Sequence, residues 1–133
     1  MHPTVTFAAL LAALSQSAPV MAQGIALQTA VYQERVGDGG RTIVPAARLM
    51  PGDRVVTILT WIAPHSGTYT AVSAVPSRLA LESTSREGLE VSTDGGRSWR
   101  RLADTDAVPA GTTHIRWRLT GGEGRLSYRA VVH

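Results

Sequence analysis

The pattern with the clearest chemical meaning is the segment of residues 92–99, which reads STDGGRSW and matches the Asp-box pattern S-x-D-x-G-x-[ST]-W. A carboxylate at Asp94 can accept backbone N–H groups within a tight turn. Gly95 and Gly96 tolerate positive φ angles, and Trp99 can fold back over the turn. The segment therefore predicts a structural turn built by Asp94, Gly95, Gly96 and Trp99.

The same segment also admits an enzymatic interpretation, because Asp-boxes occur in sugar-processing propellers of the sialidase type. Those propellers need several copies of the motif at a fixed repeat, whereas this chain contains one copy. A single short motif also carries a high risk of a chance match. We therefore expect a turn rather than an active site, and keep a glycan-active enzyme as an alternative.

Three arginines form a candidate anion-binding face, namely Arg116, Arg118 and Arg129. Alternation predicts that they project from one sheet face on adjacent strands. A nearby hairpin carries Arg97, Arg100 and Arg101. Guanidinium groups bind carboxylate and phosphate with two hydrogen bonds, so this face could hold an anionic glycan or a lipid headgroup. A solvated face with cross-strand ion pairs is the interpretation that we favour.

The overall charge excludes one class of partner. The 13 basic residues are all arginine and are balanced by 10 acidic residues, which gives a net charge of +3. This mild excess is far from the density of a dedicated nucleic-acid binder. We therefore expect no nucleic-acid partner.

The remaining titratable residues form no known catalytic pattern. His65, His114 and His133 lack the spacing of a zinc site, and there is no nucleophile elbow, P-loop or dinucleotide fingerprint. Residues 104–106 read DTD and could lend oxygens to calcium, but the other positions of an EF-hand loop are missing. The sequence therefore predicts no catalytic residue, no metal site and no cofactor.

The N-terminal segment has the features of a secretion signal. Residues 7–14 read FAALLAAL, an apolar run well short of the roughly 20 residues that span a bilayer. Val20 and Ala22 lie at the third and first positions before the expected cut, where signal peptidase requires small residues. We predict a signal peptide over residues 1–22 and an exported domain over residues 23–133, in the periplasm, on the cell surface or released, with no transmembrane span in the mature form.

The exported segment is long enough for one domain with one hydrophobic core. It has no cysteine, so packing must stabilise it without disulfides. Apolar residues alternate in short runs between turn-forming residues, which is typical of an all-β sandwich. The expected strands are residues 25–34, 54–62, 68–75, 79–83, 89–92, 98–102, 114–119 and 125–132.

Two of these strands show the clearest alternation. Residues 114–119 and 125–132 each have one apolar face, and we expect them to form a hairpin across residues 120–124. Trp61, Trp117 and Tyr128 should then share one core. The strand of residues 54–62 is unusual because both its faces are largely apolar: Val56 and Ile58 lie opposite the Trp61 face. We expect part of that second face to be covered by the N-terminal segment or by a partner.

Four pieces of the sequence, in this order, resemble the bacterial conserved-repeat domain of unknown function. They are PGDRVVTIL at residues 51–59, VPS at 75–77, the Asp-box-like hairpin, and THIRW at 113–117 followed by residues 125–131. The resemblance covers residues 48–132, although residues 65–67 read HSG where the family usually has Asn-Thr-Gly. It implies an immunoglobulin-like antiparallel β-sandwich of seven to eight short strands, found in secreted and cell-surface proteins and carrying no known catalytic residues.

These observations together predict a non-enzymatic exported structural or interaction module of the bacterial cell envelope. Its partner would be a protein or an anionic envelope component. Two alternatives stay open: a binding module that uses the arginine face for an anionic glycan or lipid headgroup, and a glycan-active enzyme based on the Asp-box.

Overall fold

The computed structural model of the chain describes residues 3–7, 20–22, 25–85, 88–103 and 107–133, without the side chains of residues 20–22 and 66. These parts of the chain form strands and connecting loops. They contain no helix that is long and apolar enough to cross a bilayer.

Nine strands are present in the described residues. They are β1 (Thr4–Phe7), β2 (Val20–Ala22), β3 (Ile25–Gly37), β4 (Gly40–Pro45), β5 (Arg54–Ala74), β6 (Leu79–Thr84), β7 (Glu90–Ser92), β8 (Arg100–Arg101) and β9 (His114–Val132). The main path of the sheet runs β2-β3-β5-β9-β7-β8, with β4 beside β3, β6 beside β9, and β1 beside β5. All pairs are antiparallel except β1 with β5, which are parallel.

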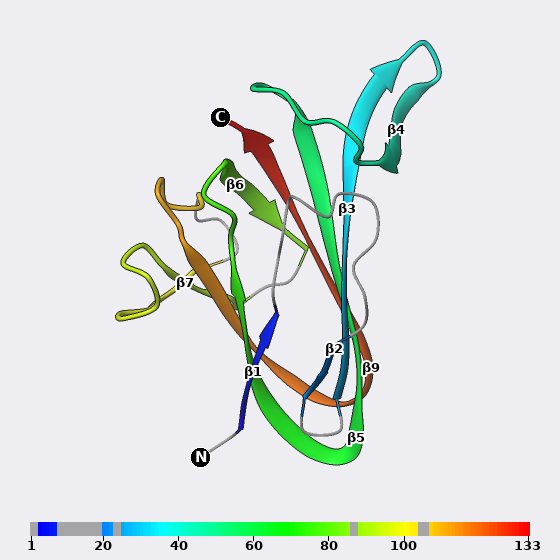
Figure 1. The fold of residues 1–133 in the computed structure, drawn as a ribbon. Helices are drawn as coiled ribbons and strands as arrows, with labels where there is room; N and C mark the ends of the chain where they lie inside the picture. The colour runs from blue at the N-terminus through cyan, green and yellow to red at the C-terminus, as the bar shows by residue number, and fades with distance from the viewer. Residues whose placement is uncertain (1–2, 8–19, 23–24, 86–87, 104–106) are drawn as a thin grey trace.

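The two longest strands, β5 and β9, give the sheet its curl (Figure 1). They pair on both sides of an interruption, residues 54–63 with 122–131 and residues 68–74 with 114–120. Both strands bend in the middle, so their two halves face each other across the core. We call β2, β3, β4, β6 and the adjoining halves of β5 and β9 the first half-sheet. The second half-sheet contains β1, β7, β8 and the other halves.

The expected hairpin between residues 114–119 and 125–132 is wrong, because both segments belong to the single strand β9. The intervening glycines produce a bend instead of a reversal. A side chain at Gly121 would collide with the backbone of Pro64, and one at Gly124 would collide with the ring of Trp61. Strand β5 bends at the same level, with a register shift between Ala63 and Thr68. The two strands therefore bend together and stay paired on both sides.

The all-β prediction is confirmed. The expectation of an antiparallel sheet of short strands is wrong in two respects, because β1 pairs in parallel and because β5 and β9 have 21 and 19 residues. Both long strands arise from the fusion of two predicted short ones. Strands β1, β2 and β4 have no counterpart among the expected strands, and β8 is shorter than the expected strand of residues 98–102.

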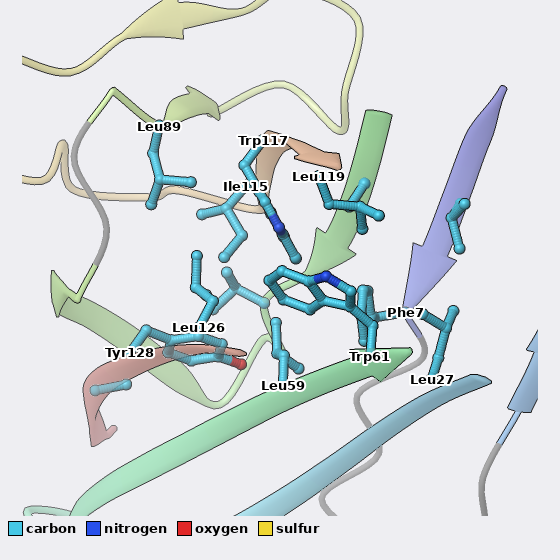
Figure 2. Packing of buried hydrophobic residues seen from close by; sticks show 14 of the residues in the cluster. Phe7, Leu27, Leu59, Trp61, Leu89, Ile115, Trp117, Leu119, Leu126 and Tyr128 are labelled. Carbon is cyan, nitrogen blue, oxygen red and sulfur yellow. The ribbon is translucent and has the colours of Figure 1, made fainter. Parts of the chain in front are cut away.

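The core between the half-sheets contains Trp61, Trp117 and Tyr128, as predicted (Figure 2). Phe7 of β1 joins them: its ring stacks on Trp117 at 5.5 Å between centroids and meets Trp61 edge-on at 6.3 Å. The two indoles lie 5.8 Å apart. Such aromatic pairs each contribute about 0.5–1.5 kcal/mol beyond the burial of their area. The cluster therefore joins three strands that are distant in sequence.

Two strands of the sheet lie within the predicted signal peptide. Strand β1 places Val5 and Phe7 in the core, with 1% and 2% of their surfaces exposed, and β2 pairs with the start of β3. The predicted cut after Ala22 would therefore remove two strands from the fold.

Candidate functional site

The Asp-box segment lies between β7 and β8 and is organised around the carboxylate of Asp94. The Oδ1 atom accepts hydrogen bonds from the backbone N–H groups of Arg97 and Ser98, at 3.1 and 2.9 Å. It also accepts the Ser92 hydroxyl at 2.7 Å, while Oδ2 accepts the Ser98 hydroxyl at 2.6 Å. One carboxylate thus has four donors from its own turn.

The rest of the turn is held by hydrogen bonds, some of them to Thr113, the residue before β9. The N–H of Gly96 donates to Ser92 Oγ at 2.8 Å, and the N–H of Gly95 donates to Thr113 Oγ1 at 3.0 Å. The N–H of Thr113 in turn donates to the carbonyl oxygen of Ser92 at 2.8 Å. Gly95 and Gly96 have φ angles of 82° and 91°, which L side chains rarely adopt. The backbone therefore requires both glycines of the motif.

These hydrogen bonds also decide the protonation state of Asp94. The hydroxyl and the backbone N–H of Ser98, followed by the Ser92 hydroxyl, hold the pKa of Asp94 well below the ordinary value for aspartate. Donors to the charged form favour that form. A general acid of a glycosidase needs the opposite, a raised pKa. The geometry therefore favours an acceptor and disfavours a proton donor at this position.

Trp99, the last residue of the motif, packs against an arginine of β9. The guanidinium carbon of Arg116 lies 4.3 Å from the centre of the Trp99 ring. The same guanidinium donates to Glu90 of β7 through Nε at 3.3 Å and Nη2 at 2.6 Å. A bidentate ion pair and a cation–π contact together fix the position of Arg116. This arginine already has a carboxylate partner within the protein.

A shallow depression of about 410 Å³ lies beside this stack, on the outer face of the second half-sheet. Its lining includes the threonines Thr4, Thr6 and Thr70 together with Trp99 and Arg116. Glu90 holds the Arg116 guanidinium, so the other polar and aromatic groups of the depression are threonine hydroxyls, the Trp99 indole and the His114 imidazole.

The structure does not bring the three predicted anion-binding arginines together. Arg116 and Arg118 lie on the half of β9 in the second half-sheet, whereas Arg129 lies beyond the bend, in the first. The expectation of one arginine face is wrong because a hairpin was assumed to place the two segments side by side. Arg129 Nε lies 3.8 Å from Oε2 of Glu34, and Arg41 Nη1 lies 3.4 Å from Oε1 of the same side chain. The Glu34 side chain is only 3% exposed.

The outer face of the first half-sheet carries a larger depression, of about 470 Å³. Its apolar part consists of Ile43 from β4 with Val56 and Ile58 from β5, and its cationic rim consists of Arg125 and Arg129 from β9. Val56 and Ile58 form the second apolar face that the sequence already indicated. Ile43 and Arg125 were missed, because only the register of β4 and the bend of β9 bring them to this face.

The β3–β4 hairpin extends this face beyond the rest of the sheet (Figure 1). Strand β5 begins at Arg54, which pairs with Glu34, so the residues of β3 after Glu34 pair with β4 alone. Val36 and Ile43 lie on the same side as Glu34 and are 77% and 49% exposed. Contiguous exposed apolar residues often mark an interaction site. We call the surface formed by Val36, Ile43, Val56, Ile58, Arg125 and Arg129 the outer-face patch.

The three histidines considered above differ in their surroundings, although His114 and His133 line the same depression of about 410 Å³. His65 is exposed at the bend of β5, His114 Nδ1 lies 3.0 Å from Thr113 Oγ1, and His133 Nε2 lies 2.7 Å from the carbonyl oxygen of Ser77. Within the described ranges, no three His, Cys, Asp or Glu side chains gather in a way that could hold a metal ion. The weak calcium candidate at residues 104–106 lies outside the described residues.

Comparison with known proteins gives no family and no function. No model of a protein family matches the chain, and no curated protein matches it. Among solved structures, the chain is similar to a protein of unknown function from Vibrio parahaemolyticus, with 14% identity and a TM-score of 0.31. The match covers 73% of this chain and 96% of the other. A likeness of this degree carries no functional argument.

Proposed function

We propose that the protein is an exported, non-enzymatic interaction module of the bacterial cell envelope, which binds a partner protein through the outer-face patch. The observation that carries this proposal is a depression with an apolar part, Ile43, Val56 and Ile58, beside the guanidinium groups of Arg125 and Arg129. Protein interfaces combine an apolar centre with a polar rim. Cationic rim groups favour a partner that places carboxylates beside its apolar residues.

The export part of the proposal rests on the sequence. The apolar run of residues 7–14 and the small residues before position 23 fit a cleaved secretion signal. The resemblance of residues 48–132 to the conserved-repeat domain supports a secreted or cell-surface setting and an immunoglobulin-like fold class. N-terminal sequencing of the exported protein tests this part: we expect the chain to begin at Gln23, and a cytoplasmic protein that begins at Met1 would contradict export.

The two alternative functions receive less support. An anion-binding arginine face would need several guanidinium groups in one place, yet Arg116 lies on the second half-sheet, where it is bound to Glu90, and Arg129 lies on the first half-sheet. A glycan-active enzyme would need a reactive carboxylate at Asp94, and that group already accepts four hydrogen bonds from its own turn.

Site-specific photo-cross-linking in the native host tests the interaction surface. A photoreactive amino acid replaces Ile43 or Arg125 in the patch, and Arg97 of the Asp-box turn serves as an exposed control outside it. We expect one cross-linked adduct of the same mass from both patch positions and none from the control. Adducts that form equally at Arg97, or at neither patch position, would contradict the proposed surface.

A further inference from the structure

Strand β1 covers the edge of β5 in the second half-sheet, and its side chains show which kind of strand fits there. Residues Thr4–Phe7 pair in parallel with Thr70–Ser73 of β5, and the N–H of Thr70 donates to the carbonyl oxygen of Pro3 at 2.9 Å. The side chains alternate: Val5 and Phe7 are buried in the core, while Thr4 and Thr6 are exposed.

The residues that form β1 also belong to the predicted signal peptide. Phe7 begins the apolar run that would enter the export machinery, and the same ring stacks on Trp117 in the folded chain. This step of the inference rests on the proposed function, because export with cleavage after Ala22 removes β1 from the protein.

The loss of β1 changes the second half-sheet in two ways. The backbone groups of Thr70–Ser73 that pair with β1 become an open strand edge, and open edges are templates for pairing with another chain. The space filled by Val5 and Phe7 becomes an apolar slot against Trp61 and Trp117. Both changes favour the same occupant, an extended strand with alternating side chains.

We propose that the exported form accepts a β-strand from a partner protein in this slot, parallel to β5. The segment would carry an aliphatic and an aromatic residue two positions apart, with small polar residues between and before them, as Thr4–Phe7 does. Backbone pairing supplies affinity in this mode of recognition, and the alternate side chains supply specificity.

A second copy of the exported chain is a poor source of this strand. In the described residues after position 22, the pattern of a branched aliphatic residue two positions before an aromatic one occurs at Leu59–Trp61, Ile115–Trp117 and Leu126–Tyr128. All three segments lie in β5 or β9, and all six of those side chains are buried in the core. A folded copy would have to dismantle its own core to donate any of them. The donor is therefore a different protein.

The test uses the exported protein, whose first residue is determined by mass spectrometry, and a fluorescent peptide with the sequence of residues 3–9, PTVTFAA. We expect saturable binding to the form that begins at Gln23 and none to the uncleaved chain, in which β1 fills the slot. A control peptide with serine at the positions of Val5 and Phe7 should bind at least about tenfold more weakly, because it lacks both of the side chains that are buried in the slot. If the cleaved form is unfolded alone, the first peptide should restore its near-ultraviolet circular dichroism.

A variant of the full chain separates the slot from export. Phe7→Asp places a charge where the ring is buried, so β1 should leave the slot without any cleavage, and this variant should bind the peptide. If the protein stays uncleaved in the host, the proposed export is contradicted. The Phe7→Asp chain then still tests whether the slot binds the peptide. The inference is overturned if neither the cleaved form nor this variant discriminates between the two peptides. It is also overturned if the cleaved form sediments as a dimer that excludes the peptide.

Discussion

The aromatic cluster and the Asp94 turn both stabilise the fold, but by opposite means. Phe7, Trp61 and Trp117 come from three strands that are distant in sequence and act by burial. Asp94 is exposed, and its four donors come from residues 92–98. Burial is indifferent to pH, whereas a hydrogen-bonded carboxylate depends on its charge. Of these two regions, the aromatic cluster joins elements that are distant in sequence, whereas the hydrogen bonds to Asp94 stay within one turn.

Removal of a ring from the cluster should have the largest effect. Trp117→Ala deletes a buried side chain that contacts both other rings, and such substitutions cost about 3–5 kcal/mol. That loss is a large part of the stability of a typical domain. Urea unfolding followed by circular dichroism measures it. An unchanged midpoint would show that Trp117 does not hold the half-sheets together.

A substitution in the bend that supports the cluster should lower the stability almost as much as the loss of a ring. Gly124→Ala introduces a methyl group into the space of the Trp61 ring, and overpacking of this kind costs about 1–3 kcal/mol. Gly39→Ala is the matched control, because a side chain there meets open space, and its effect should stay within about 0.5 kcal/mol. Equal midpoints for the two variants would mean that the bend does not depend on a bare backbone at position 124.

Asp94→Ala should have a smaller, local effect. It leaves two backbone N–H groups and two hydroxyls of the turn without their acceptor, so the thermal midpoint should fall by less than in Trp117→Ala. Asp94→Asn keeps one acceptor oxygen and should recover part of the loss. Glycosidase assays on the parent protein complete the comparison: hydrolysis that disappears in both variants at unchanged midpoints would favour the enzymatic alternative.

The smallest expected effect is a difference in pH dependence. The folded-state pKa of Asp94 is lowered, so its contribution to stability is present above the unfolded value of about 4 and is lost as pH falls toward the folded value. Urea midpoints near neutral pH, at about pH 4 and at about pH 2.5 should therefore fall more steeply for the wild type than for Asp94→Asn. Parallel curves for the two proteins would contradict an ionised, hydrogen-bonded Asp94.

The fold was predictable where its cause is local. Alternation at residues 114–119 and 125–132 identified the buried faces correctly, including Trp117 and Tyr128. The connection was not predictable, because glycines at 121, 122 and 124 are equally compatible with a tight reversal and with a bend. Contact between Gly121 and the backbone of Pro64, which lies far away in the sequence, selects the bend.

The candidate site shows the same division. The Asp94 turn can be predicted from eight consecutive residues. The exception is Thr113, which accepts a hydrogen bond from the turn and lies in the next loop. The outer-face patch combines Ile43, Val56 and Arg125 from three strands, and its composition depends on their register. The position of Phe7 in the core could not be predicted for a different reason: its apolar neighbours indicate a signal peptide, so no strand is expected there from the sequence.

The pairing of β5 with β9 has a consequence for the order of events during synthesis. Its ladder joins Arg54 to Val131 and Ala74 to His114, so no part of it can form until β9 has been made. The entropy cost of closing such long loops arises before the strand pairs contribute any stability. Proteins with this topology therefore fold in roughly milliseconds to seconds. We expect the sheet of the nascent chain to stay open throughout most of its synthesis. A slow-folding precursor of this kind would remain competent for threading across a membrane before its sheet closes.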